Sequence, residues 1–345
     1  MKFIKTFFVL FLLLIVAGET YLLANNFPKI FPGKPTPIPK PLLAYSFPNL
    51  QKTHFIPTQI TLGKKVTDGT KTFSQIFYFS VPQKPKSTTF LTVSGLMNAP
   101  KKPGNYPVIV MFRGFVPSNI YQPGVGTEPV AHVLAENGFI TLAPDFLGFG
   151  QSSSPSADPF ENRFQTYTTA LSLLASLSTL NKGLSASYGA TLQADMSKIG
   201  IWGHSNGGHI TLATLAISGV IYPTVVWAPV STSFPYSILY YTDESDDQGK
   251  ALRKTLAQFE TVYNTDLFSP PLYYQWIKAP LQIDQGLSDE EVPYWWSQNL
   301  EKTLQKDGDN VTLNVFPNAD HNMLPNGWND AVNKTLQFYK SYFAK

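Results

Sequence analysis

The sequence lacks cysteine altogether, and this absence excludes several kinds of chemistry. A chain without thiols forms no disulfide bonds, holds no thiolate-bound metal and has no cysteine nucleophile. It also offers no cysteine for a lipid anchor of the bacterial lipoprotein type. The absence is compatible with a location outside the cytoplasm but does not establish one.

Charge is also scarce. Charged residues make up 14% of the 345 residues, and the formal net charge is only +3, which does not indicate nucleic acid as a partner. Hydrophobic residues reach 43%, which is enough for a sizeable core and argues against global disorder. The length permits one large domain or two small ones.

The N-terminal segment, residues 1–26, has the layout of an export signal. Lys2 and Lys5 precede an apolar run from Phe7 to Gly18, as in secretory signal peptides. With Tyr21–Ala24 included, the segment approaches the roughly 20 residues that span a bilayer, and no clear cleavage site follows. We expect a signal peptide or a membrane anchor, with the rest of the chain exported. The alternative is a buried N-terminal helix.

Residues 27–52 contain a cluster of prolines, which favours an extended, semi-rigid linker. We expect this linker to hold the folded domain, residues 53–345, away from the membrane. The sequence contains no internal repeat.

Strand-like and helix-like segments alternate in the folded part. Thr72–Val81 and Thr88–Pro100 are rich in β-branched and aromatic residues and predict a hairpin. Six short apolar runs predict buried strands: "YPVIVMF", "FITLAP", "KIGIW", "YPTVVW", "APLQIDQG" and "NVTLNVF". Three segments predict helices: "EPVAHVLAENG", "FENRFQTYTTALSLLASLSTL" and "GHITLATLAIS". This alternation predicts the α/β class, with a mostly parallel sheet and helices on both faces.

Residues 231–276 interrupt the alternation, because they separate two strands by far more than a usual crossover. Their acidic and aromatic residues and a predicted helix favour a lid-like insertion over the site. The alternative is a surface excursion with no role in binding.

The stretch "GIWGHSNGGH" places Ser205 between Gly203 and Gly207, directly after a strand and before a helix. A serine in such a sharp turn has a strained backbone that only small neighbours tolerate, and its hydroxyl emerges above the sheet. The local context therefore predicts that Ser205 is a nucleophile and that both glycines shape the turn.

A serine needs a base, and the chain has five histidines. His321 follows the last predicted strand, at the edge where the serine emerges, so we expect it to be the general base and acid. We expect the other four to be packing or surface residues, with the side chain of His204 pointing away: His54, His132, His204 and His209.

The histidine in turn needs a carboxylate. Asp289 lies in the loop beyond "APLQIDQG", where ligands and catalytic groups gather in such sheets, and Glu290 is the fallback. Asp284 lies inside the strand and is expected to point into the sheet. The chain order Ser205, Asp289, His321 is the one expected for an α/β-hydrolase.

An oxyanion needs fixed donors. We expect the backbone N–H groups of Asn206, which follows the serine, and of Phe115, in the loop after "VIVMF". Arg113 in that loop either binds a substrate carboxylate or braces the loop.

Several blocks of the chain resemble the catalytic domain of the prolyl oligopeptidase family: "YPVIVMFRGF", "GFITLAPDFLGFGQS", "IGIWGHSNGGH", "SPPLYYQWIKAPLQIDQGLSDEEVP" and "FPNADH". They are also similar to dienelactone hydrolases and acetyl esterases. The resemblance covers roughly Val93 to the C-terminus and places Ser205, Asp289 and His321 on the family's catalytic positions. Asp145 matches a structural loop. Arg113-Gly114 departs from the family's usual His-Gly, and no β-propeller fits before the domain.

The resemblance implies a serine peptidase acting on small peptides through an acyl-enzyme. A carboxylic ester hydrolase is the close alternative, and a non-catalytic binding protein of the same fold is the alternative of another class. We predict no cofactor and no metal, because the three residues suffice chemically and no His/Asp/Glu cluster has ligand spacing. The sequence leaves the oligomeric state open.

Overall fold

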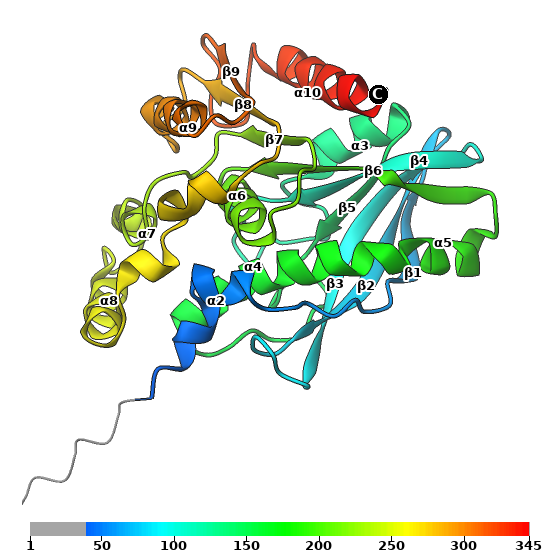
Figure 1. Ribbon diagram of the computed structural model, residues 1–345. Helices are drawn as coiled ribbons and strands as arrows, with labels where there is room; N and C mark the ends of the chain where they lie inside the picture. Colours follow the sequence, from blue (N-terminus) through cyan, green and yellow to red (C-terminus); the bar gives the residue numbers. More distant parts are fainter. Residues whose placement is uncertain (1–38, 345) are drawn as a thin grey trace, which may run out of the picture. The chain divides into compact units, whose positions relative to one another are not determined.

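The computed structural model describes residues 39–344 (Figure 1). The predicted signal or anchor, residues 1–26, lies outside the described residues, as do residues 27–38 of the predicted linker. Within the described part, no helix is both long and apolar enough to cross a membrane.

One nine-stranded sheet organises the folded unit, in the order β1-β2-β3-β5-β4-β6-β7-β8-β9. The first three strands are antiparallel to their neighbours, and the six from β5 to β9 run parallel. The strands are β1 (Thr61–Asp68), β2 (Thr72–Pro82), β3 (Phe90–Pro100), β4 (Gly104–Phe112), β5 (Ile140–Pro144), β6 (Leu192–His204), β7 (Thr224–Trp227), β8 (Leu281–Gly286) and β9 (Val311–Phe316). The predicted class is confirmed: this is an α/β-hydrolase fold with a mostly parallel sheet.

Helices join these strands and cover both faces of the sheet (Figure 1). The longer ones are α3 (Glu128–Glu136), α4 (Pro159–Ser176), α5 (Leu180–Tyr188), α6 (Asn206–Ser218), α8 (Lys250–Val262), α9 (Tyr294–Lys306) and α10 (Trp328–Phe343). The predicted long helix, residues 160–180, corresponds to α4 and the 3-10 turn η2 (Leu177–Thr179), and α5 follows as a further helix.

Alternate residues of the central strands enter two different cores. On β4, Val108 and Val110 pack with α4, α5 and α6, whereas Ile109 and Met111 pack with α3 and α10. Side chains of successive strand residues point to opposite faces, so a strand that is covered on both faces is a continuous apolar run. This explains why these strands were predictable from short hydrophobic stretches.

The predicted hairpin is confirmed, since β2 pairs with β3 from Thr72↔Pro100 to Pro82↔Phe90. The edge strand β1 was not predicted. Its residues are mostly exposed and include charged side chains, so the segment has little hydrophobic signal.

The folded unit begins earlier than the predicted boundary at residue 53. Pro41–Tyr45 forms a 3-10 helix (η1) and Phe47–Gln51 forms α2, and both belong to the unit that starts at Pro41. Tyr45, Phe47 and Leu50 are almost completely buried in the larger core. Pro41 is the first residue of η1 and Pro48 lies in the first turn of α2, where a missing N–H costs nothing, so both lie at helix starts.

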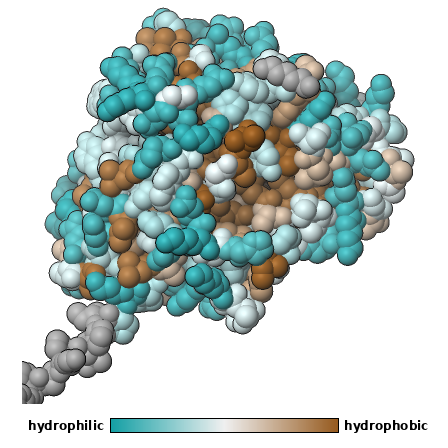
Figure 2. Space-filling model, viewed as in Figure 1, coloured by the Kyte–Doolittle hydropathy of each residue, from teal (hydrophilic) through white to brown (hydrophobic). Residues whose placement is uncertain are grey.

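Residues 231–276 fold into short helical segments packed against α4. They are α7 (Tyr236–Leu239), η3 (Thr242–Glu244), α8, η4 (Thr265–Phe268) and η5 (Pro270–Trp276). Phe234, Phe259 and Phe268 of this insertion contact the rings of Phe160 and Phe164 on α4, with centroids 4.7 to 6.3 Å apart. Figure 2 shows apolar side chains gathered near the middle of the displayed face, with polar residues around them.

Candidate active site

The loops that follow four parallel strands lie at one edge of the sheet. β4 is followed by the Arg113–Phe115 loop, β6 by Ser205, β8 by Asp289 and β9 by His321. The carboxyl ends of parallel strands lie at the same edge, which is where such sheets bind ligands.

Ser205 lies in a strained turn between β6 and α6, with φ 56° and ψ −123°. Such a conformation is costly for a residue with a side chain and persists only where the surroundings impose it. A Cβ on Gly203 would lie 2.6 Å from the carbonyl oxygen of Gly207, and one on Gly207 would lie 1.9 Å from that of Phe112. Both positions therefore require glycine, for the reason the sequence indicated.

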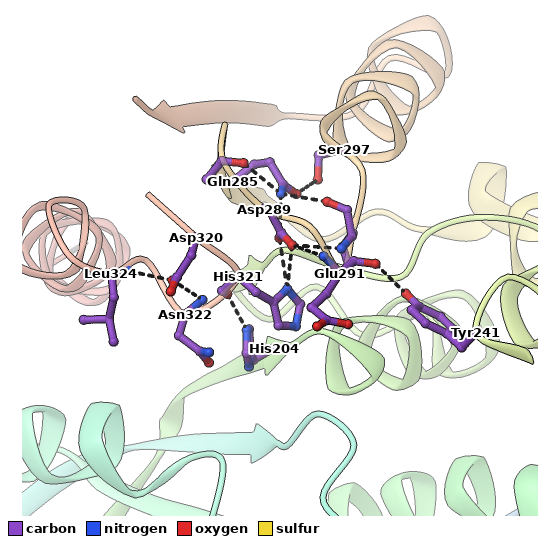
Figure 3. A network of polar contacts seen from close by, with 12 residues as sticks. His204, Tyr241, Gln285, Asp289, Glu291, Ser297, Asp320, His321, Asn322 and Leu324 are labelled. Carbon is purple, nitrogen blue, oxygen red and sulfur yellow. Dashed lines mark hydrogen bonds and ion pairs between the residues drawn. The ribbon is translucent and has the colours of Figure 1, made fainter. Parts of the chain in front are cut away.

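His321 and Asp289 form a hydrogen-bonded pair (Figure 3). The Nδ1 atom of His321 lies 2.9 Å from Oδ2 and 3.1 Å from Oδ1 of Asp289. The Asp289 side chain has no solvent exposure, and that of His321 is 15% exposed. Because a carboxylate only accepts hydrogen bonds, Nδ1 carries the proton, and Nε2 of the neutral ring keeps a lone pair for base catalysis.

Further donors surround the Asp289 carboxylate. Burial by itself raises the pKa of Asp289. The hydrogen bond and charge of His321 lower it, as do the N–H groups of Val292 and Glu291, which donate at 2.8 and 2.9 Å, and together these effects outweigh burial. The pKa of Asp289 is consequently below its usual value, so the side chain is ionised at neutral pH. The fallback residue, Glu290, is exposed.

Gln285 holds Asp289 in place, a role that the sequence analysis does not identify. Its Nε2 donates to Asp289 Oδ2 at 2.9 Å, and its Oε1 accepts from the Ser297 hydroxyl at 2.7 Å (Figure 3). The Ser297 bond fixes which end of the buried amide faces the carboxylate. The contact joins β8 to α9, and no local pattern reveals such a pairing.

His204 is a packing residue, as expected, but it packs on the predicted catalytic histidine. Its Nε2 donates to the backbone carbonyl of His321 at 2.9 Å, and the two ring centroids lie 4.6 Å apart (Figure 3). Burial, reinforced by the neighbouring His321, lowers the pKa of His204 to about 4. A neutral ring with its proton on Nε2 therefore braces the His321 loop from the residue beside Ser205.

The other three histidines lie away from this pair. His209 is buried in α6, and burial lowers its pKa to about 3. His54 and His132 are exposed.

The predicted oxyanion loop faces the serine. A Cβ on Gly114 would lie 3.0 Å from the Cβ of Ser205, so the backbone of this loop approaches Ser205 closely. Asn206 is the first residue of α6, so its N–H has no partner within the helix. Phe115 projects its ring outward, with 81% of the residue exposed.

The side chain of Arg113 is turned inward and is almost completely buried. Its guanidinium lies between the rings of Tyr121 and Phe149, 4.7 and 4.2 Å from their centroids. It donates to the backbone carbonyls of Gly114 at 2.9 Å and Asp145 at 3.2 Å. Of the two roles considered, these contacts favour bracing of the loop.

Two other aspartates near the edge of the sheet have structural surroundings. Asp145 accepts hydrogen bonds from the hydroxyls of Ser94 at 2.5 Å and Tyr121 at 2.6 Å. Asp284 is fully buried in β8, as predicted, and burial raises its pKa to about 7. Neither carboxylate is bonded to a histidine among the hydrogen bonds of the described residues.

Two hollows open beside Asn206, with volumes of about 200 and 180 Å³. Asn162 and Thr166 on α4 line both of them, together with Asn206. The larger hollow has apolar walls from Phe146, Leu147, Phe149 and Ile210, and the smaller contains Arg163 and Tyr167.

Comparison with known proteins identifies the class to which this fold and site belong. Residues 178–345 match the prolyl oligopeptidase family, and residues 74–221 match the chlorophyllase family. The protein is thus an α/β-hydrolase and a serine hydrolase. The part of the chain from residue 178 to residue 345 is similar to the catalytic domain of the prolyl oligopeptidase family.

Solved structures share the fold at low sequence identity. The acetyl xylan esterase of Paenibacillus sp. R4 is 16% identical with a TM-score of 0.59, covering 89% of this chain and 96% of that one. Acetyl xylan esterase 1 of Thermoanaerobacterium sp. is 16% identical with a TM-score of 0.55, covering 88% and 95%. The dipeptidyl peptidase 4 of Porphyromonas gingivalis is 15% identical with a TM-score of 0.50, covering 84% of this chain but 36% of that one.

Proposed function

We propose that the protein hydrolyses small carboxylic esters through an acyl-enzyme on Ser205, with His321 as base and acid and Asp289 as its partner. The hydrogen-bonded pair of Asp289 and His321, set against the strained turn that carries Ser205, supports this assignment. The three side chains come from loops after β6, β8 and β9, which end at one edge of the sheet.

The reaction follows from these positions. Nε2 of His321 accepts the hydroxyl proton of Ser205 while Oγ attacks the ester carbonyl carbon, and Asp289 stabilises the resulting imidazolium. The N–H groups of Asn206 and Phe115 donate to the oxyanion. His321 then protonates the departing alkoxide, which leaves as the alcohol. Water, deprotonated by the same nitrogen, attacks the acyl-enzyme and releases the acid.

The preference for esters is supported by the size of the site and by the comparisons. The two hollows beside Asn206 have a combined volume of a few hundred cubic ångströms, which is at the lower end of the volumes of ordinary ligand sites. The chain matches nearly the full length of the acetyl xylan esterases but about a third of the dipeptidyl peptidase. Peptidase activity is the second candidate, favoured by the family match of residues 178–345.

Two assays test the proposal. A fluorophosphonate probe should label wild-type protein and not the Ser205→Ala variant; absence of labelling in folded wild-type protein would instead favour a non-catalytic binding protein. A panel of 4-nitrophenyl esters beside aminoacyl-4-nitroanilides then separates the two activities. Cleavage of the anilides with no cleavage of short esters would overturn the preference for esters.

A further inference from the structure

The chain contains three arginines, and two of them line the hollows beside Asn206. Arg113 in the larger hollow is near the buried carboxylate of Asp145, whose charge favours the charged form of Arg113. Arg163 in the smaller hollow has a different environment. Its nearest interacting groups are the phenols of Tyr167 and Tyr241, and its Nε is buried without a hydrogen-bond partner.

No ion pair of Arg163 is present among the described side chains, and the acidic residues closest in sequence are otherwise engaged. Glu161 accepts hydrogen bonds from Tyr45 at 3.1 Å and Ser156 at 2.6 Å and lies 3.6 Å from Lys84. Asp158 caps the start of α4 by accepting from two backbone N–H groups. A guanidinium withdrawn from water without a counter-ion is unfavourable, and an anion that enters the hollow relieves this cost.

A series of hydrogen bonds connects α4, which carries Arg163, to the turn that carries Ser205. His209 donates from Nδ1 to the carbonyl of Val230 at 3.1 Å, which leaves Nε2 to accept from the Tyr167 hydroxyl at 2.7 Å. Arg163 lies four positions before Tyr167 on the same helix, α4, and lines the same hollow as Tyr167 and His209. The N–H of Val230 donates to the carbonyl of Ser205 at 3.1 Å. Arg163 therefore lies beside the hydrogen-bond network that connects α4 to the turn carrying Ser205.

The strand order indicates which part of a substrate reaches Arg163. Asp289 and His321 follow β8 and β9, on one side of β6, and His321 protonates the leaving alcohol there. The oxyanion loop follows β4 and α4 follows β5, both on the other side of β6. The hollow containing Arg163 lies against α4 and Asn206, so it receives the acyl part of the ester.

We infer that Arg163 forms an anion subsite for the acyl group, so that the preferred substrates are esters whose acid part carries a distal carboxylate. The inference rests on the proposed function, since it assigns the acyl side of that same site. The apolar walls of the neighbouring hollow suit the methylene chain between the two carboxyl carbons.

The test compares matched esters. The half-esters mono-4-nitrophenyl adipate and suberate are assayed beside 4-nitrophenyl hexanoate and octanoate, which have the same chain lengths. Wild-type protein should have a kcat/KM about 10- to 100-fold higher for the half-ester of at least one pair, as expected for a charge-assisted hydrogen bond. Arg163→Gln should abolish this preference, because its kcat/KM falls more for each half-ester than for the neutral ester of the same chain length.

The third arginine provides the control. Arg253 on α8 donates to the carbonyl of Gln248 and lines neither hollow, so Arg253→Gln should keep the wild-type preference. Arg163→Lys retains the positive charge and should keep part of the preference for half-esters. Equal kcat/KM for both members of each pair in wild-type protein, or an equal loss on both in Arg163→Gln, would overturn the inference while the proposed function stands.

A binding measurement keeps the inference testable if no ester is cleaved, which would be a failure of the proposed function. Adipate and hexanoate are compared as protectants of Ser205 against the fluorophosphonate probe. Adipate should slow labelling of wild-type protein more than hexanoate does, and the difference should vanish in Arg163→Gln. Equal protection by both acids in wild-type protein overturns the anion subsite.

Discussion

In the proposed mechanism Asp289 acts through the proton of His321, because the carboxylate holds that proton on Nδ1 and leaves Nε2 for Ser205. We predict that Asp289→Asn lowers kcat for a 4-nitrophenyl ester on the order of 10³- to 10⁴-fold, since an amide does not impose this tautomer. Glu290→Gln, at the exposed neighbouring position, should change kcat by less than about threefold and serves as the control. Comparable losses in both variants would contradict the assignment.

Asp284 predicts a dependence of stability on pH. Its donors from Asn314 and Gln282 do not outweigh burial, so its pKa is about 7 in the folded protein and about 4 in the unfolded chain. Between these values the folded state binds the additional proton. Its contribution to the free energy of unfolding is therefore fully present below pH 4 and is lost as pH rises through 7, at up to about 1.4 kcal/mol per pH unit.

The Asp284→Asn variant, which does not titrate, should have a flatter dependence of unfolding free energy on pH between 4 and 8 than wild-type protein. Urea unfolding at several pH values measures this slope. The slope is the informative quantity, because the amide also changes the hydrogen bonds to Asn314 and Gln282. An unchanged slope would show that Asp284 ionises normally in the folded protein.

Among the elements, the insertion is joined to the main core by aromatic packing. Phe259 on α8 is 4% exposed and contacts the rings of Phe160 and Phe268, at 4.7 and 5.2 Å between centroids. We predict that Phe259→Ala destabilises the whole unit by about 3 to 5 kcal/mol, measured as a shift in urea unfolding. Lys254→Ala, exposed on the same helix, should shift it little. Two separate transitions in the variant would show that the insertion unfolds independently.

What could be predicted from sequence depends on whether the signal is local. The turn at Ser205 is a strand, a strained residue and a helix within a few positions, so glycine spacing reveals it. Asp289 and His321 were predicted because each follows a recognisable buried strand. Gln285 and Tyr167 act through partners on other elements, Ser297 on α9 and His209 on α6, and these contacts exist only once the sheet has formed.

The same argument explains the error at the linker. Proline content predicts an extended segment, but from Pro41 to Gln51 the structure depends on where buried side chains find partners. Phe47 stacks on Tyr273 of the insertion at 4.9 Å, a contact 226 positions away along the chain. Such a contact stabilises α2 and leaves no local trace in the sequence.

For the whole molecule, the boundary at Pro41 predicts the outcome of truncation. A chain that begins at Pro41 should keep the unfolding temperature of the full-length protein. A chain that begins at Thr53 loses Tyr45, Phe47 and Leu50, each worth about 1.5 to 3 kcal/mol of burial, and should unfold at a much lower temperature. Equal unfolding temperatures for the two truncated chains would contradict the packing of η1 and α2.

Export and membrane tethering by residues 1–26 stay a prediction. We expect the full-length protein in the membrane fraction, or in the medium after cleavage, and the chain from Pro41 in the soluble fraction. Fractionation with alkaline carbonate extraction measures this. Full-length protein that remains soluble inside the cell would contradict the predicted signal.

The placement of α2 has a mechanical consequence. Phe47 packs its ring against Tyr167, at 5.9 Å between centroids, and Tyr167 donates a hydrogen bond to His209 on α6. Tension applied to the amino-terminal end of the folded unit would thus be transmitted through η1 and α2 to the helices behind the turn that carries Ser205. If the protein is anchored by that end, a force on the anchor would change the catalytic rate.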